Sequence, residues 1–235
     1  MSEHTHKQFD AEMDSIRAGV LAMGGLVETQ LSRAIEILKD GDDQGAMDRI
    51  GAVEREINAA QVDMDQLCSQ IIAKRQPAAI DLRMILTVTK IVNDLERIGD
   101  EVKKIAYKAA QTRDASRLQQ VRHFTATRAA GQAGAMLQLA LDAFARLDPV
   151  AATEVIDHDK EIDAAFAGML RQLISYMMED PRTISAALEI VFVAKSIERV
   201  GDHTKNIAEA VVQLVKGTDV RHASVAEIRA EVAKE

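Results

Sequence analysis

Two short stretches of the chain carry acidic residues at a spacing that could bind a cation. They read NDLERIGDEVKKIA at 93–106 and KSIERVGDHTKNIA at 195–208. On a helix, each stretch places two carboxylates one turn apart. These are Glu96 with Asp100 and Glu198 with Asp202, and Asn206 lies one turn further along. Like charges at this spacing destabilise a helix by about 0.2–0.5 kcal/mol. A bound cation would remove that cost, so metal binding is one explanation of the repeated pattern.

The preceding segment in each half supplies further oxygen ligands. They are Glu54 and Asn58 in EREIN, and Asp159 and Asp163 in DKEID. Asp159 falls within an apolar stripe, where an unpaired carboxylate is costly to bury. Oxygen ligands without thiolates favour iron, manganese or magnesium, with zinc as a further candidate. The alternative is that basic neighbours neutralise the acids. These neighbours are Arg97, Lys103, Arg199 and Lys205.

The signals for catalysis are weaker than those for metal binding. Di-metal enzymes built on helical bundles combine Glu with Glu-x-x-His pairs, and neither stretch contains one. His203 directly follows Asp202 and therefore faces another side of the helix. The chain shows no recognisable nucleophile triad and no Gly-rich phosphate loop after a strand. A non-enzymatic protein is favoured, with a carboxylate-bridged metalloenzyme or metal-storage bundle as the alternative and a purely structural helical protein as a third reading.

Long helices are needed to position these acids. The composition favours helix, because Ala, Leu, Ile, Glu, Asp and Arg dominate and only 3 Pro and 12 Gly interrupt them. The breaks leave six long segments, near 8–39, 44–74, 78–112, 116–147, 149–179 and 181–216. The acids recur in the same order in both halves, which indicates duplication of a three-helix unit. We therefore predict an all-α fold of two tandem three-helix bundles with six long antiparallel helices, divided into 1–113 and 114–235.

Apolar stripes beside the acids predict the core. In the first half the stripe is Ile85, Val88, Ile91, Leu95, Ile98, Val102 and Ile105, and in the second it is Ile190, Val193, Ile197, Val200, Ala208 and Val211. Gly99 and Gly201 lie beside these stripes, inside predicted helices, at a cost of about 1 kcal/mol relative to Ala. We expect them to allow close approach of a neighbouring helix, with a hinge as the alternative.

Composition limits the partners and the compartment. The formal net charge of −8 and the scattered basic residues argue against a nucleic-acid partner. The sequence shows no signal peptide and no apolar run of the roughly 20 residues that span a bilayer, so we expect a cytoplasmic protein. Cys68 is the single cysteine and lies among apolar residues, which predicts a buried, inert thiol.

The chain resembles the PhoU family, the accessory regulators of phosphate uptake. The resemblance rests on DLERIGDEVKKIA and SIERVGDHTKNIAE, on QPAAIDLRMI, on KGTDVRH and on the two-fold repeat, and it covers roughly 10–222. It implies a cytoplasmic protein, often a homodimer, that binds metal ions through its acidic motifs. It also implies a negative regulator of the phosphate regulon that links the ATPase subunit of the phosphate ABC transporter to a sensor histidine kinase. Any membrane contact would then be peripheral, through the transporter.

Carried over by position, the resemblance assigns metal ligands to both bundles. They are Glu54, Asn58, Glu96 and Asp100 in the first, and Asp159, Asp163, Glu198, Asp202 and Asn206 in the second. Asn58 stands where an acid is expected, and Lys104 occupies the position of Asn206. The first site would therefore hold less negative charge and have a cation nearby. We predict tighter metal binding in the second bundle.

Overall fold

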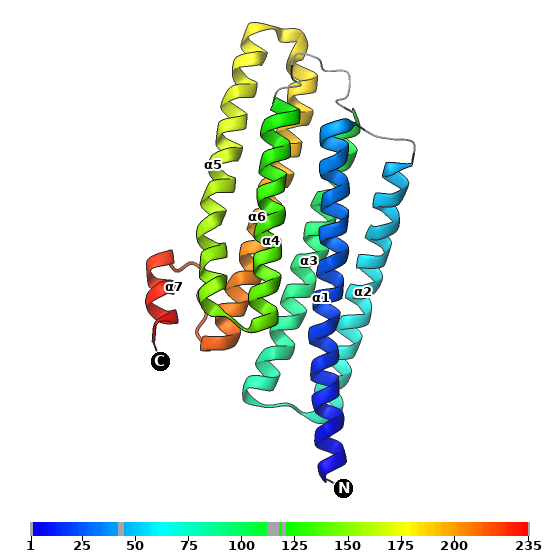
Figure 1. Cartoon of the computed structure of the whole chain (residues 1–235), viewed down its shortest axis with the longest axis vertical. Helices are drawn as coiled ribbons and strands as arrows, with labels where there is room; N and C mark the ends of the chain where they lie inside the picture. Colours follow the sequence, from blue (N-terminus) through cyan, green and yellow to red (C-terminus); the bar gives the residue numbers. More distant parts are fainter. Residues whose placement is uncertain (1, 42–44, 112–117, 119–120, 235) are drawn as a thin grey trace.

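The computed structural model describes residues 2–41, 45–111, 118 and 121–234. These residues form seven α-helices and no strand: α1 (Ser2–Asp40), α2 (Ala46–Arg75), α3 (Ala79–Gln111), α4 (Thr127–Arg146), α5 (Pro149–Glu179), α6 (Ile184–Lys216) and α7 (Val225–Val232). A π-helical turn, η2 (Val121–Ala126), precedes α4, and a 3-10 turn, η3 (Pro181–Thr183), precedes α6. The six long helices run alternately up and down (Figure 1). The predicted all-α fold is confirmed.

The helices pack as two bundles side by side. Helices α1, α2 and α3 contact one another, as do α4, α5 and α6. The most extensive contact between any two helices joins α3 to α6, and α1 also contacts α4. In Figure 1, α1 and α4 lie in front of α3 and α6, while α2 and α5 form the two sides. The two three-helix bundles are as predicted, while the proposed division at 113/114 falls within 112–117, outside the described residues.

Most helix boundaries follow the local sequence signals. Asp148 caps α5, because its Oδ1 accepts hydrogen bonds from the backbone N–H groups of Val150 and Ala151 at 2.9 and 3.0 Å. Two predicted starts are wrong. Helix α1 already begins at Ser2 and not near 8, and α4 begins only at Thr127, because the preceding turn is π-helical.

The short helix α7 was not expected from the sequence. A capping box starts it, in which Ser224 and Glu227 exchange hydrogen bonds. Its buried side chain is Ile228, and the helix packs mainly against α5, as Figure 1 shows at the C-terminal end. The Ser-x-x-Glu spacing was therefore a usable signal for this helix.

The predicted apolar stripes form the core. Every residue named for the two stripes is buried. Cys68 is buried as well, and burial, with a smaller contribution from Asp65, raises the pKa of its thiol to about 11. The prediction of a buried thiol is confirmed, and at neutral pH it stays protonated.

The two halves are also joined at the far end of the α3–α6 contact. Arg83, near the start of α3, donates from Nη1 to the carbonyl oxygen of Leu214 at 3.2 Å. This bond satisfies a carbonyl in the last turn of α6, which ends at Gly217 in the left-handed conformation. Arg83 therefore acts as a helix cap supplied by the other bundle.

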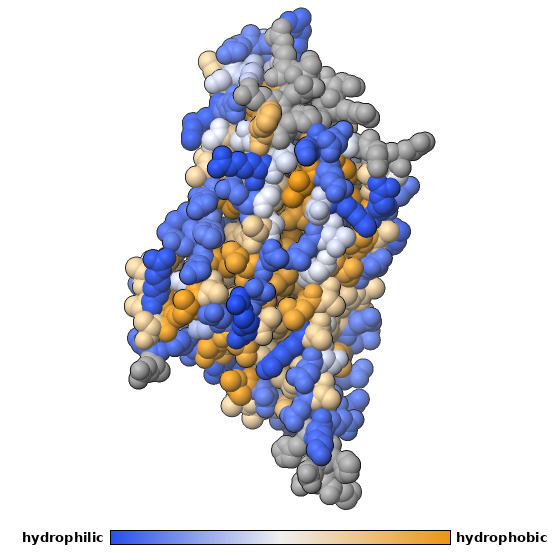
Figure 2. All heavy atoms as spheres, viewed as in Figure 1, coloured by the Kyte–Doolittle hydropathy of each residue, from blue (hydrophilic) through white to orange (hydrophobic). Residues whose placement is uncertain are grey.

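The surface mixes polar and apolar side chains. Figure 2 shows hydrophilic side chains on the face seen in Figure 1, with apolar areas between them. Within the described part of the chain, no helix is long and apolar enough to cross a membrane.

Candidate metal centre

The motif glycine of the second bundle lies where α5 packs against α6. A Cβ atom on Gly201 would lie 3.2 Å from Cγ2 of Ile162 and 3.4 Å from Oδ1 of Asp159. The side chain of Asp159 is only 5% exposed, and its Oδ2 accepts a hydrogen bond from Nζ of Lys205 at 3.0 Å. Its Oδ1 is buried and has no hydrogen-bond partner. The space left by the missing side chain of Gly201 therefore faces an unsatisfied carboxylate oxygen.

Three further carboxylates on α5 and α6 are linked to Asp159 by their charges, and the four together are called the second acidic cluster: Asp159, Asp163, Glu198 and Asp202. Burial raises the pKa of Asp163, and the charges of Asp159 and Glu198 raise it further. Burial also raises the pKa of Asp202, followed by the charges of Glu198, Asp159 and Asp163. The charges of these carboxylates thus raise one another's pKa across the contact between α5 and α6.

Two lysines partly neutralise this cluster. Besides the Lys205 contact, Nζ of Lys195 donates to both carboxylate oxygens of Glu198 at 2.5 and 2.6 Å. Within the described part of the chain, Asp163 and Asp202 form no ion pair. Four carboxylates and two lysines leave a local charge of −2, which is the electrostatic setting that a divalent cation would relieve.

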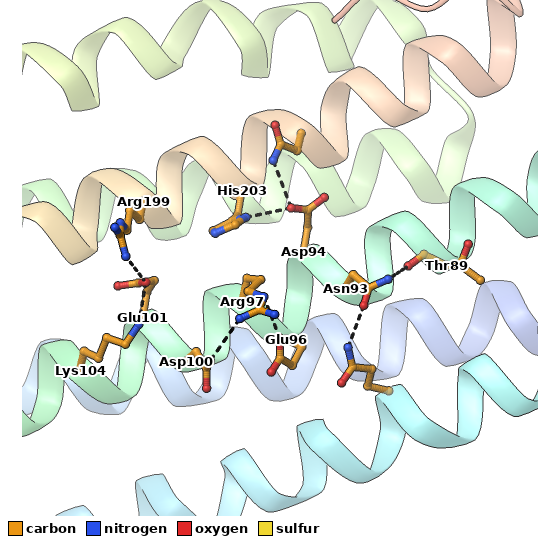
Figure 3. Close-up of polar contacts among 12 residues, drawn as sticks. Thr89, Asn93, Asp94, Glu96, Arg97, Asp100, Glu101, Lys104, Arg199 and His203 are labelled. Atoms are coloured by element: carbon orange, nitrogen blue, oxygen red, sulfur yellow. Dashed lines mark hydrogen bonds and ion pairs between the residues drawn. The ribbon is translucent and has the colours of Figure 1, made fainter.

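The first bundle holds a smaller set, called the first acidic cluster: Glu54, Glu96 and Asp100. Burial raises the pKa of Glu96, and the charge of Asp100 raises it further, with a smaller effect of Glu54. Lys103 binds Glu54 at 2.6 Å. Arg97 lies 3.4 Å from Glu96 and 4.0 Å from Asp100, as Figure 3 shows. Three carboxylates against two cations leave a charge of −1, one negative charge fewer than in the second cluster.

The motif glycine of the first bundle also allows a close approach. A Cβ atom on Gly99 would lie 3.3 Å from Cδ1 of Ile57 and 3.2 Å from Oε1 of Gln30. Gln30 is fully buried, and neither of its amide atoms has a hydrogen-bond partner. The prediction that both motif glycines permit close helix packing is confirmed. Gln30 itself was missed, since an isolated glutamine in α1 carries no sequence signal.

Some of the basic residues expected to neutralise the acids do form ion pairs with them. Lys103 and Lys205 occupy equivalent positions and both reach back to an acid on the preceding helix, Glu54 and Asp159 respectively. Arg199 was expected to compete as well, but it binds Glu101 on α3 at 3.1 Å. Only the Lys103 and Lys205 contacts therefore belong to the repeat, since Lys195, which binds Glu198, has Asn93 as its counterpart in the first half.

One of the predicted ligands, Asn206, is not brought into the acidic clusters. Asn206 donates from Nδ2 to Oδ1 of Asp94 at 3.2 Å, and so faces α3. The same Asp94 oxygen lies 2.8 Å from Nδ1 of His203. Asn58 is exposed on α2, one turn after Glu54. Lys104 pairs with Glu101 at 2.8 Å, so this contact holds the cation away from the first cluster.

The second acidic cluster fits a metal ion better than the first does. Among the described residues, no three His, Cys, Asp or Glu side chains are already arranged as a metal site. The lysine contacts account for this in part, because they hold Glu198 and Asp159. The unsatisfied Oδ1 of Asp159 beside Gly201 is nevertheless an available hard-oxygen ligand. Release of the two lysines would supply the remaining oxygens.

Comparison with known proteins identifies the family. The model of the PhoU domain matches the chain twice, over residues 20–109 and 126–211. This chain belongs to the PhoU family. It is 44% identical over 233 residues to the Pseudomonas aeruginosa phosphate-specific transport system accessory protein PhoU homolog, covering 99% of this chain and 95% of that protein. It is 41% identical to the Escherichia coli phosphate-specific transport system accessory protein PhoU, covering 94% and 91%.

Solved PhoU structures share the fold. The crystal structure of PhoU from P. aeruginosa superposes with a TM-score of 0.81 and covers 89% of this chain and 100% of its own. The phosphate transport system regulatory protein PhoU from Streptococcus pneumoniae gives 0.82 at 25% identity, covering 90% and 99%. These PhoU proteins are named as accessory or regulatory proteins and not as enzymes, in agreement with the prediction for this chain. Each PhoU match contains one acidic cluster, and α7 lies beyond the second.

Proposed function

We propose that the chain is a cytoplasmic, metal-binding accessory protein of a phosphate-specific transport system. In this role it acts as an adaptor between the ATPase subunit of the phosphate transporter and a sensor histidine kinase, and as a negative regulator of phosphate-responsive genes. The printed names of its relatives support the link to phosphate transport. The long two-bundle surface is compatible with two partners and with a homodimer.

One observation carries the metal part of the proposal. A buried Asp159 oxygen of the second acidic cluster has no hydrogen-bond partner, and the charges of Glu198, Asp159 and Asp163 raise the pKa of Asp202. Such an atom costs about 1–3 kcal/mol when it stays unpaired, so a ligand that binds it recovers free energy. A hard or borderline cation such as Fe, Mn, Mg or Zn matches the all-oxygen ligand set.

Calorimetric titration of the metal-free protein with MnCl₂ tests metal binding. We expect the Glu198→Gln variant to lose at least tenfold in affinity at the tighter site, because it removes a charged oxygen ligand. The equivalent Glu96→Gln variant should affect only the weaker site. Equal losses in both variants would contradict the predicted difference between the bundles.

Affinity capture tests the adaptor role. Tagged protein is recovered from phosphate-replete cells, and its partners are identified by mass spectrometry. We expect the transporter ATPase and the sensor kinase with the wild-type chain, and less of both with the Glu198→Gln variant. Recovery of neither protein by the wild-type chain would reject the adaptor proposal.

A further inference from the structure

A second chemical feature lies on the contact between α3 and α6, outside both acidic clusters. It is a pocket of about 420 Å³, here called the seam pocket, lined by Glu101, Lys104, Lys108, Phe192, Lys195, Ser196 and Arg199. Four of these seven residues are cationic and one is acidic. Two of these cations are neutralised beside the pocket, since Lys108 pairs with Glu189 at 2.7 Å and Lys195 with Glu198. The excess of one positive charge therefore belongs to Lys104 and Arg199, one from each bundle, in a chain whose net charge is −8.

A buried carboxylate organises the pocket. The side chain of Glu101 is 6% exposed and accepts hydrogen bonds from Lys104 at 2.8 Å and from Arg199 at 3.1 Å (Figure 3). Burial raises the pKa of Glu101, but the hydrogen bonds from Lys104, Ser196 and Arg199 outweigh it and lower the pKa overall. One anion therefore holds two cations in place. This arrangement leaves an excess positive charge on side chains that are still about half exposed.

The pocket also presents an exposed aromatic ring. Phe192 is 54% exposed, and Nζ of Lys108 lies 5.4 Å from the centre of its ring. Leu188, one helical turn before Phe192, and Tyr107, next to Lys108, are large apolar side chains that are also about half exposed. A small inorganic anion could neutralise the positive charge of the pocket, but it would leave this apolar surface exposed to water.

The chain contains a natural comparison for this pocket. The motif acids recur 102 positions apart. By the same shift Asp94 corresponds to Ser196 and Glu101 to His203, so the contact of Asp94 with His203 corresponds to that of Ser196 with Glu101. A second pocket of about 240 Å³ includes the counterparts of four seam-pocket residues. Lys90 replaces Phe192, Asp94 replaces Ser196, Asn206 replaces Lys104 and Ala210 replaces Lys108. The duplication thus produced two pockets, and one of them combines clustered cations with an exposed aromatic ring.

We propose that the seam pocket is a docking site for an acidic segment of a partner protein that carries an apolar side chain. Carboxylates of this segment would contact Lys104 and Arg199, while its apolar side chain would cover Phe192. Charge complementarity favours an acidic segment at this site, because the rest of this acidic chain repels such a segment. The inference gives a surface to the proposed adaptor function and rests on that function only for the identity of the partner.

Fluorescence anisotropy with a defined peptide tests this site. The probe is a fluorescein-labelled synthetic peptide, Glu-Glu-Leu-Phe-Glu-Glu, titrated with the full chain in EDTA. We expect saturable binding that weakens as salt is raised. Lys104→Ala should weaken it about three- to fivefold, as expected for a partly exposed ion pair. Lys90→Ala removes the same charge from the comparison pocket and should change it less than about twofold.

The aromatic contact is tested separately. Phe192→Ala should weaken binding about tenfold, the effect expected for an aromatic anchor. The same change should have little effect on a control peptide, Glu-Glu-Ala-Ala-Glu-Glu, which lacks the apolar side chains. Circular dichroism verifies that each variant is folded, and Lys104→Gln replaces Lys104→Ala if the latter unfolds.

Several results would overturn the docking site. The first is an equal loss of peptide affinity in the Lys90→Ala and Lys104→Ala variants, and the second is binding of the Glu-Glu-Ala-Ala-Glu-Glu peptide as tight as that of the probe. The third is displacement of the probe by millimolar inorganic phosphate at constant ionic strength. The fourth is the absence of saturable binding. Because the titration is done in EDTA, it does not depend on metal binding. Failure of the MnCl₂ titration would reject the metal proposal alone, and failure of the peptide titration would reject the docking site alone.

Discussion

Replacing Asp202 by Asn should have opposite effects on the metal-free and the metal-bound protein. Partial desolvation and the charges of three neighbouring carboxylates raise the pKa of Asp202, although the residue is still exposed to solvent. A carboxyl group whose pKa is raised by folding destabilises the folded state at every pH above that raised value, and the penalty disappears as the pH falls below the unfolded value of about 3.9. At neutral pH the penalty is fully present. Its removal should therefore stabilise the metal-free chain.

The size of each effect follows from the cluster. Glu198 and Asp202 are like charges one turn apart on α6, a pair that costs about 0.2–0.5 kcal/mol. Since Asp202 is exposed, we expect the Asp202→Asn variant to gain no more than this free energy in EDTA. For a chain of this size the gain corresponds to a rise in Tm of about 1–2 °C. Metal at 100 times its Kd stabilises the wild-type protein by about 2.7 kcal/mol, or about 5–10 °C. A tenfold loss of affinity in the variant lowers this by about 1.4 kcal/mol.

Thermal unfolding of both proteins in EDTA and in excess MnCl₂ measures the two effects. Asp142→Asn is the matched control, since it removes an exposed carboxylate that is paired with Arg146 on α4, away from both clusters. The control should leave the metal-induced shift unchanged. The reasoning is refuted if Asp202→Asn lowers the Tm in EDTA while the metal-induced shift stays at its wild-type size.

Three further predictions concern packing in the two bundles. Lys205→Ala leaves the buried carboxylate of Asp159 without its ion-pair partner, so urea unfolding should show a loss of about 2–4 kcal/mol in the free energy of unfolding; an unchanged midpoint would show that the carboxylate is solvated. Gly201→Ala should lower that free energy by up to about 2 kcal/mol, because about 1–3 kcal/mol of overpacking exceeds the helix propensity that is gained. Gly131→Ala is the control, since its Cβ would meet nothing within 4 Å, and it should raise the free energy of unfolding by about 0.5–1 kcal/mol. A change of the same sign in both variants would refute the close-packing argument. Cys68, with its pKa raised to about 11, should resist iodoacetamide at pH 8 in the folded protein and react after denaturation, as measured by mass spectrometry; rapid alkylation of the folded chain would contradict its burial.

Much of the candidate site could be predicted because helical periodicity is local. The apolar stripe of α6 fixes which face is buried, and that in turn fixes the direction of Glu198 and Asp202 relative to the core. The same argument placed Asp159 on the buried face of α5. The argument failed for Asn206, because the helical position of this residue allows its side chain to face either the acidic cluster or α3. Its hydrogen bond with Asp94 shows that it faces α3.

The seam pocket could not be predicted from either motif alone. Arg199 lies close to the acids of its own helix in sequence, and the sequence offered those acids as its partners. Packing of α3 against α6 instead provides Glu101, which is 98 residues away and buried. A buried carboxylate requires a cationic partner more strongly than an exposed one does, so the tertiary contact determines where Arg199 binds.

The sequence by itself determined the six long helices apart from two of their starts, the duplication and the two sets of repeated acids, because these depend on residues within one or two helical turns of each other. Tertiary structure decided which of these acids lack partners. The oxygen of Asp159 beside Gly201 is unsatisfied only because α5 packs closely against α6, and the cations of the seam pocket meet only because the two bundles join there. Desolvation and long-range charge pairing depend on what surrounds a group in space, and the spacing of residues along a helix does not contain that information.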